Sequence, residues 1–135
     1  MSNDIFLDTS YVIALYIQSD QYHDTAVALS ERLEHDRCKI VTTIPVIFEI
    51  GGAFASVRFR KKGGELLDTL SQDPLVETVP ITDSVYAEAV ALFNSRKDKN
   101  WSLTDCFSFV VMNERGLTEA LTADIHSNKQ DFVAC

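Results

Sequence analysis

Short apolar runs alternate along the chain with longer stretches in which apolar residues recur every three or four positions. The short runs are continuous in apolar residues or rich in β-branched ones, a pattern that indicates strands covered on both faces. The predicted strands lie at residues 4–8, 39–42, 76–80 and 119–123, with a fifth at 132–134. The predicted helices lie at about residues 9–16, 23–35, 44–58, 66–70, 82–96 and 104–115.

Residues that favour helix ends support several of these boundaries. Thr43 is a suitable N-cap, and Pro45 lies in the first turn after it, where proline is tolerated. Gly116 is expected to end the helix that begins near residue 104. Gly63 and Gly64 are expected to separate the helix that ends near residue 58 from the next one.

Strands that alternate with helices are typical of βαβ units, and therefore of a parallel sheet with helices on both faces. The 135 residues suit a single α/β domain spanning residues 1–135. In such sheets, ligands bind beyond the carboxyl ends of the strands. The residues near that edge are therefore the first candidates for chemistry.

Four carboxylates lie in apolar stretches, where an isolated charge is costly: Asp8, Glu49, Asp105 and Asp124. Asp8 and Asp124 come at the ends of predicted strands, while Glu49 and Asp105 fall within the first two turns of predicted helices. All four can therefore reach the same edge of the sheet. A shared divalent cation would explain them, and all-oxygen ligands favour Mg²⁺ or Mn²⁺ over zinc.

Each acid also has a structural explanation. Asp8 can cap the following helix, and Asp124 can be a turn residue. Residues 102–105 match a capping box, in which Asp105 would bond back to the helix start. Glu49 is the hardest to explain in this way, because the residues three and four positions away on its helix are apolar or glycine.

The distribution of charge narrows the functions that fit. The net charge of −8 argues against a uniformly basic nucleic-acid-binding surface. The main basic cluster is either a solvated helix end or a contact for a polyanion, and it consists of Arg58, Arg60, Lys61 and Lys62. Residues 96–99 contain a second, weaker cluster of the same kind.

The cysteines and the apolar segments bear on location. Cys38, Cys106 and Cys135 are far apart and form no C-x-x-C pair, so neither a disulfide framework nor a zinc site is indicated. No apolar run is long enough to span a membrane, and no basic segment precedes the first predicted helix. A soluble protein of the reduced cytoplasm is expected.

Four short motifs, in order along the chain, resemble those of PIN-domain ribonucleases. The motifs are Phe6-Leu-Asp-Thr-Ser10, Glu49 after Thr43-Ile-Pro45, Ser102-Leu-Thr-Asp105, and Leu121-Thr-Ala-Asp124-Ile-His126. Any one of them is weak, whereas the ordered set of four is fairly specific and covers almost the whole chain. The likeness is greatest to the small VapC-type toxins of prokaryotic toxin–antitoxin pairs.

The resemblance implies a three-layer α/β/α domain with a central, mainly parallel sheet of four or five strands. It implies a Mg²⁺ or Mn²⁺ site made by the acids Asp8, Glu49, Asp105 and Asp124. Thr9 and Thr104 match positions that often lie beside the metal in this family. The implied activity is endonucleolytic cleavage of RNA by metal-activated water, commonly in a homodimer restrained by a cognate antitoxin protein.

The chain departs from the family pattern near its C-terminus. Ser127 and Asp131 stand where an aromatic residue and a glycine are usual. This departure leaves room for a PIN fold that binds a partner protein without cutting RNA. A further alternative is a phosphoryl-transfer protein with Asp8 as phospho-acceptor, although Ser10 stands where a haloacid-dehalogenase phosphatase has a second aspartate.

Overall fold

The computed structural model describes residues 4–122, and a parallel sheet lies at its centre. The strands of these residues are β1 (Ile5–Leu7), β2 (Ile40–Thr43), β3 (Val76–Val79) and β4 (Ala120–Leu121). They are arranged in the order β3-β2-β1-β4, and every neighbouring pair is parallel. The predicted α/β fold with a parallel sheet is therefore confirmed, while the strand expected at 132–134 lies outside the described residues.

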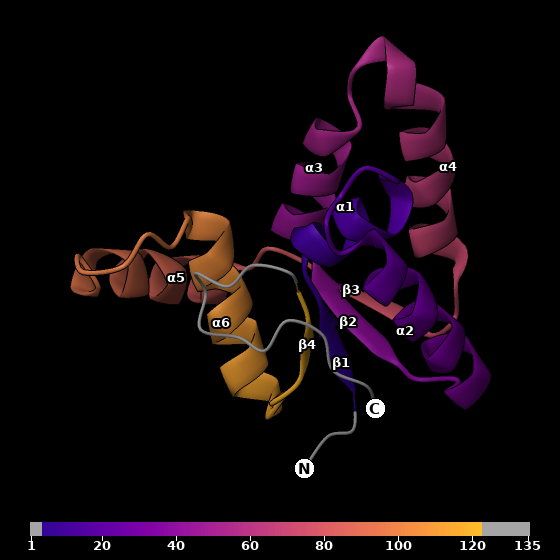
Figure 1. The fold of residues 1–135 in the computed structure, drawn as a ribbon. Coiled ribbons are helices and arrows are strands. Elements are labelled where there is room, and N and C mark those ends of the chain that lie inside the picture. The colour runs from indigo at the N-terminus through magenta and orange to yellow at the C-terminus, as the bar shows by residue number, and fades with distance from the viewer. Residues whose placement is uncertain (1–3, 123–135) are drawn as a thin grey trace.

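Helices cover both faces of this sheet. They are α1 (Thr9–Tyr16), α2 (His23–Asp36), α3 (Ile44–Ala53), α4 (Val57–Gln72), α5 (Asp83–Ser95) and α6 (Leu103–Arg115). Figure 1 shows α5 and α6 on one side of the sheet and α1, α2 and α4 on the other. Helix α3 and the start of α4 project beyond the edge at which β1 and β2 end.

Local sequence accounts for most of these boundaries. All of β1 is buried, which explains why Ile5–Leu7 is continuous in apolar residues. The Thr43 hydroxyl accepts a hydrogen bond from the Val46 amide at 3.2 Å and so caps α3, as predicted. Gly116 has φ +67° and ends α6, because glycine adopts this left-handed conformation without steric cost.

The prediction is wrong between α3 and α4. Helix α3 was expected to continue to about residue 58 but ends at Ala53, and the two glycines lie inside α4 instead of breaking the chain. Gly63 has a packing role there, because a Cβ atom at this position would lie 2.6 Å from Cβ of Phe54. The glycine therefore lets α4 pack closely against the residue that ends α3.

Gly63→Ala is expected to lower the free energy of unfolding by about 1–3 kcal/mol, because the added methyl group must displace Phe54. Gly64→Ala is the matched control, since a Cβ there meets nothing within 4 Å. Alanine favours a helix over glycine, so the control is expected to gain about 0.5–1 kcal/mol. Chemical denaturation measures both, and a stabilising Gly63→Ala would contradict the assigned contact.

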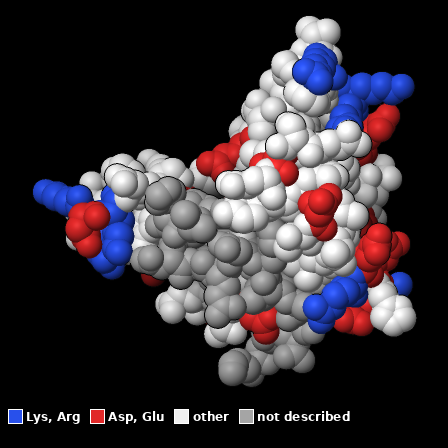
Figure 2. Space-filling view, in the orientation of Figure 1, with Lys and Arg blue, Asp and Glu red and all other residues white. Residues whose placement is uncertain are grey.

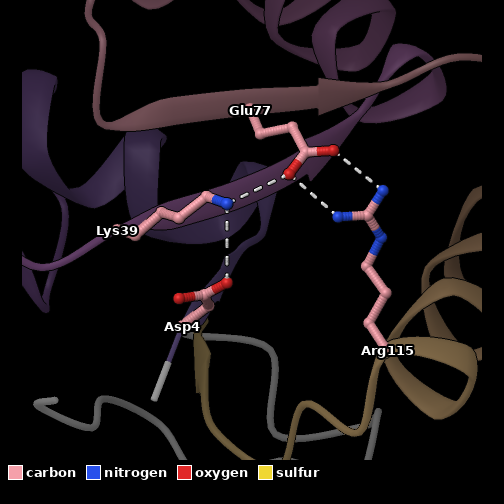
Figure 3. A network of polar contacts seen from close by, with 4 residues as sticks. All are labelled: Asp4, Lys39, Glu77 and Arg115. Atoms are coloured by element: carbon pink, nitrogen blue, oxygen red, sulfur yellow. Dashed lines mark hydrogen bonds and ion pairs between the residues drawn. The ribbon is translucent and has the colours of Figure 1, made fainter. Parts of the chain in front are cut away.

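A network of ion pairs ties the end of α6 to the amino-terminal edge of the sheet (Figure 3). Arg115 of α6 contacts both carboxylate oxygens of Glu77 on β3, at 2.9 and 2.8 Å. Lys39, just before β2, lies 3.4 Å from Glu77 and 3.9 Å from Asp4. The hydrogen bond from Arg115 is the main reason why the pKa of Glu77 is lowered.

Glu77→Gln is expected to lower the free energy of unfolding at neutral pH. The loss should not exceed about 1 kcal/mol, because solvent screens ion pairs at the surface and the Glu77 side chain is 39% exposed. The folded state lowers the pKa of Glu77, so its contribution is present above the unfolded value of about 4.3 and disappears as the pH falls through the lowered pKa. Unfolding curves across this range test the sign, and a difference that grows on acidification would contradict it.

Two further observations concern location and cysteines. Within residues 4–122, every helix is too short or too polar to cross a membrane. Cys106 is buried and carries a free thiol.

Candidate functional site

Asp8 stands where β1 passes into α1, at the carboxyl edge of the sheet. Its Oδ2 atom accepts hydrogen bonds from the amide of Ser10 at 3.3 Å, from the Ser10 hydroxyl at 2.8 Å and from the Thr122 hydroxyl at 3.1 Å. The explanation as a helix cap is therefore correct. Asp8 is also only 5% exposed, however, and an ordinary cap needs no such burial.

Ser10 and Thr122 were not singled out from the sequence, although both fall within motifs that were recognised. Their hydroxyls lie 2.9 Å apart, and each has a single proton to donate. When both donate to Asp8, neither can donate to the other. The two side chains therefore hold the Asp8 carboxylate, one from α1 and the other from the residue after β4. The sequence did contain a signal for them, because Ser10 lies two positions from Asp8 and Thr122 two positions from Asp124.

Glu49 lies in the second turn of α3, with an exposed side chain directed at the start of α1. The Thr9 hydroxyl donates a hydrogen bond of 2.7 Å to its Oε1 atom. Partial desolvation raises the pKa of Glu49, and the negative charges of Asp8 and Asp105 raise it further, against hydrogen bonds from Thr9 and Thr104 that lower it. Both threonines expected beside the metal thus adjoin Glu49.

Asp105 lies in the first turn of α6 and forms the predicted capping box. Its Oδ2 atom accepts from the Ser102 amide at 3.0 Å, and the Asp105 amide donates to the Ser102 hydroxyl at 3.0 Å. Capping does not remove Asp105 from the site, because its charge acts on Glu49. The structure thus brings together Asp8, Glu49 and Asp105, whereas Asp124 lies outside the described residues.

Two hollows at the surface meet at Glu49. One of about 550 Å³ is lined by Asp8, Thr9 and Ser10 together with Glu49. The other, of about 350 Å³, is lined by Glu49 and Thr104 and by apolar side chains of α3. A substrate can therefore approach these acids from solvent.

The chemistry of these acids suits a hard cation, but in the structure their side chains do not surround a single point. Among residues 4–122, no three histidine, cysteine, aspartate or glutamate side chains are close enough to hold a metal ion. The donors are carboxylate and hydroxyl oxygens, which Mg²⁺ and Mn²⁺ prefer. Burial is the largest cause of the raised pKa of Glu49, and a cation would offset the further effect of the charges of Asp8 and Asp105. Asp8, Glu49 and Asp105 are the acids of the described residues that would hold it.

The basic cluster at 58–62 lies at the start of α4, not at the end of the helix that carries Glu49. A helix start disfavours cations, so the explanation as a helix C-terminus is wrong. Lys62 donates to the Tyr16 carbonyl at 3.3 Å and Arg60 to the Ala55 carbonyl at 3.0 Å, which ties both to the protein. Figure 2 shows this cluster on the projecting tip at the top of the view.

Glu49→Gln is expected to raise the free energy of unfolding at neutral pH in the presence of a chelator. Glutamine removes a charge that partial burial and the charges of Asp8 and Asp105 disfavour, while its amide oxygen can still accept from Thr9. The pKa of Glu49 is raised by folding, so the penalty is absent below the unfolded value of about 4.3 and complete above the raised pKa.

Thermal or chemical unfolding at several pH values measures this effect. Glu65→Gln, at an exposed position of α4, is the matched control and is expected to change stability little. A Glu49→Gln variant less stable than wild type at neutral pH would contradict the repulsion between these acids.

A family model described as PIN domain matches residues 5–133 of the chain. The chain belongs to the PIN-domain family. No curated protein matches it in sequence. The resemblance inferred from the four motifs is thus confirmed at the level of the family.

Two solved structures share this PIN fold. VapC20 of Mycobacterium tuberculosis, described as a toxin that cleaves the sarcin-ricin loop, is 23% identical with a TM-score of 0.80, and the match covers 98% of each chain. The structure of FitAcB from Neisseria gonorrhoeae is 22% identical with a TM-score of 0.61, covering 91% of this chain and 89% of that one. At this level of identity the likeness concerns the fold, and it agrees with the parallel sheet and its covering helices.

Proposed function

We propose that the protein is a metal-dependent endoribonuclease that hydrolyses RNA phosphodiester bonds as a single PIN domain. The observation that carries this proposal is the convergence of Asp8, Glu49 and Asp105 from β1, α3 and α6 on one edge of the sheet. Partial burial raises the pKa of Glu49, and the negative charges of Asp8 and Asp105 raise it further, as expected of acids placed to share a cation. Asp124 is proposed as a fourth ligand on the basis of its sequence motif.

The described residues would have different roles in such a site. A Mg²⁺ or Mn²⁺ ion held by the acids would lower the pKa of a bound water and neutralise charge on the phosphoryl group. The hydroxyls of Ser10 and Thr122 fix the Asp8 carboxylate, and Thr9 orients Glu49. A protein nucleophile is not required for this chemistry.

The acidic protein must still hold an acidic substrate. Figure 2 shows basic side chains on two projections, one at the tip of α3 and α4 and the other at the outer end of α5. Acidic side chains reach the surface in the hollow between these projections. We propose that Arg58, Arg60, Lys61 and Lys62 on the first projection contact the RNA backbone, while the cation offsets the charge of the acids.

We further propose that the protein is the toxin of a type II toxin–antitoxin pair. VapC20 is described as a toxin that cleaves the sarcin-ricin loop, and the FitAcB structure is that of a second PIN-fold relative. The expected partner is a cognate antitoxin that restrains a cytoplasmic homodimer. A short reading frame beside the gene, encoding a DNA-binding segment with a hydrophobic tail, would support this assignment.

A second candidate function is a protein-binding module of weak or absent catalytic activity. It is favoured by the capping box that engages Asp105 and by the lack of a three-acid ligand set among residues 4–122. Calorimetry separates the candidates, because a nuclease requires divalent binding whereas the module does not. Tight binding of Mg²⁺ or Mn²⁺ would therefore argue against the module.

Asp8→Asn is expected to reduce RNA cleavage by more than about a hundredfold, because the amide is a poorer cation ligand than the carboxylate. A chelator should abolish cleavage by the wild type. Cleavage is measured on end-labelled RNA, and circular dichroism checks that the variant still folds. Asp68→Asn, at an exposed position of α4, is the control and should cleave as wild type does. Full activity of Asp8→Asn would overturn the assigned site.

A further inference from the structure

A second cavity lies between the end of α5 and the start of α6, outside the acidic site. Its volume is about 350 Å³, within the range typical of ligand pockets. Three of its lining residues are basic, namely Arg96, Lys97 and Lys99, and Trp101 forms another part of the wall. Basic and aromatic groups that line one cavity are typical of sites for single-stranded nucleic acid.

Trp101 is held in an arrangement that leaves its indole N–H without a hydrogen-bond partner among residues 4–122. The ring packs edge-on against Phe109 at a centroid distance of 4.7 Å, with the Arg96 guanidinium at 5.1 Å and the Lys99 ammonium at 5.8 Å from its centre. The Nε1 atom is buried, and no hydrogen-bond partner for it exists among the described residues. A buried donor without an acceptor is unfavourable, so a ligand that supplies an acceptor oxygen would be stabilised here.

The charge around this cavity is opposite to that of the whole chain. Residues 96–99 carry three positive charges and one negative charge, in a protein of net charge −8. Asp98 binds Arg96 through two contacts of 3.0 Å and so fixes the guanidinium beside the indole. Lys97 and Lys99 then remain as the cations that can meet an anionic group, which makes the cavity a local site for phosphate.

The cavity adjoins the candidate active site across the first turn of α6. Cys106 is one of its lining residues, whereas the preceding residue, Asp105, acts on Glu49 at the acidic site. Successive residues of one helical turn thus serve the two sites. The cavity and the acids are therefore linked by the first turn of α6.

We propose that this cavity is a subsite for one nucleotide of single-stranded RNA, next to the position of cleavage. Lys97 and Lys99 contact the phosphate, and the Trp101 indole N–H donates to an oxygen of the same nucleotide. This inference rests on the proposed function for the identity of the polymer. It adds a positioning role for residues that neither hold the cation nor take part in the reaction.

Trp101 is the single tryptophan of the chain, so its fluorescence reports directly on the cavity. The probe is a short single-stranded RNA with 2′-O-methyl groups, added to the full-length protein in EDTA, which removes the divalent cation that the proposed cleavage requires. A saturable change in emission is expected. Lys97→Ala should raise the half-saturating concentration about tenfold, the effect of losing one charged hydrogen bond, and should reduce the dependence of binding on salt.

Arg32→Ala is the matched control, because it removes one exposed positive charge on α2 and should leave the titration unchanged. Trp101→Phe keeps an aromatic ring without the donor, and labelled RNA should bind it more weakly by fluorescence anisotropy. Folding of each variant is checked by circular dichroism. An unchanged emission on adding RNA, or an equal effect of Lys97→Ala and Arg32→Ala, would overturn the subsite.

Two further probes test the class of ligand. Inorganic phosphate or an acidic peptide that changes the emission at concentrations as low as the RNA would overturn the assignment to a nucleotide. Because EDTA removes divalent cations, the titration does not depend on catalysis. Cleavage without an emission change would remove the subsite alone, whereas an emission change without metal-dependent cleavage would remove the proposed nuclease activity alone.

Discussion

The candidate site depends on one buried carboxylate. Asp8 ends the central run of apolar residues in β1, and its Oδ2 atom collects hydrogen bonds from α1 and from the residue that follows β4. Burying this group without such donors would be costly, so the donors must be in place wherever the chain folds in this way. The ends of two neighbouring strands and the start of a helix are thereby fixed around a single oxygen atom.

The arrangement of charges at the site lowers the stability of the folded protein. Glu49 and Asp105 come from two different helices, α3 and α6, and their negative charges disfavour each other near Asp8. Figure 2 shows basic side chains on both projections and acidic ones in the hollow between them. Such a separation of charge favours a ligand set that includes both a cation and an extended anion, since each then meets the charge it needs.

Much of this arrangement was accessible from the sequence because it depends on local chemistry. Thr43, Ser102 and Gly116 mark helix ends by interactions with their own neighbours, and the structure has the helix boundaries there. The helix boundaries within residues 44–72 were predicted wrongly, because the glycine at position 63 is explained by close packing against Phe54, nine positions away. No local sequence pattern reveals this contact. The displaced boundary also moved the basic cluster from the end of one helix to the start of another.

The acids also differ in whether local sequence or distant contacts explain them. Asp8 and Asp105 looked like caps and are caps, so the local explanation was correct and yet incomplete. Glu49 lacked any local explanation, and its partners come from α1 and α6, far away in sequence. A residue that the local rules leave unexplained was thus the best guide to a site assembled from distant segments.

Helix α6 gives the molecule a mechanical link between its two edges. Asp105 lies near its first residue and Arg115 is its last, so the helix spans roughly 15 Å at 1.5 Å per residue between the acids and the ion pairs at Glu77. A rigid rod anchored at one end transmits a tilt to the other. Substitutions of Asp4, Lys39 or Glu77 could therefore change the relative positions of the acids without replacing any acid. Related proteins could in this way differ in reaction rate while keeping the same motifs.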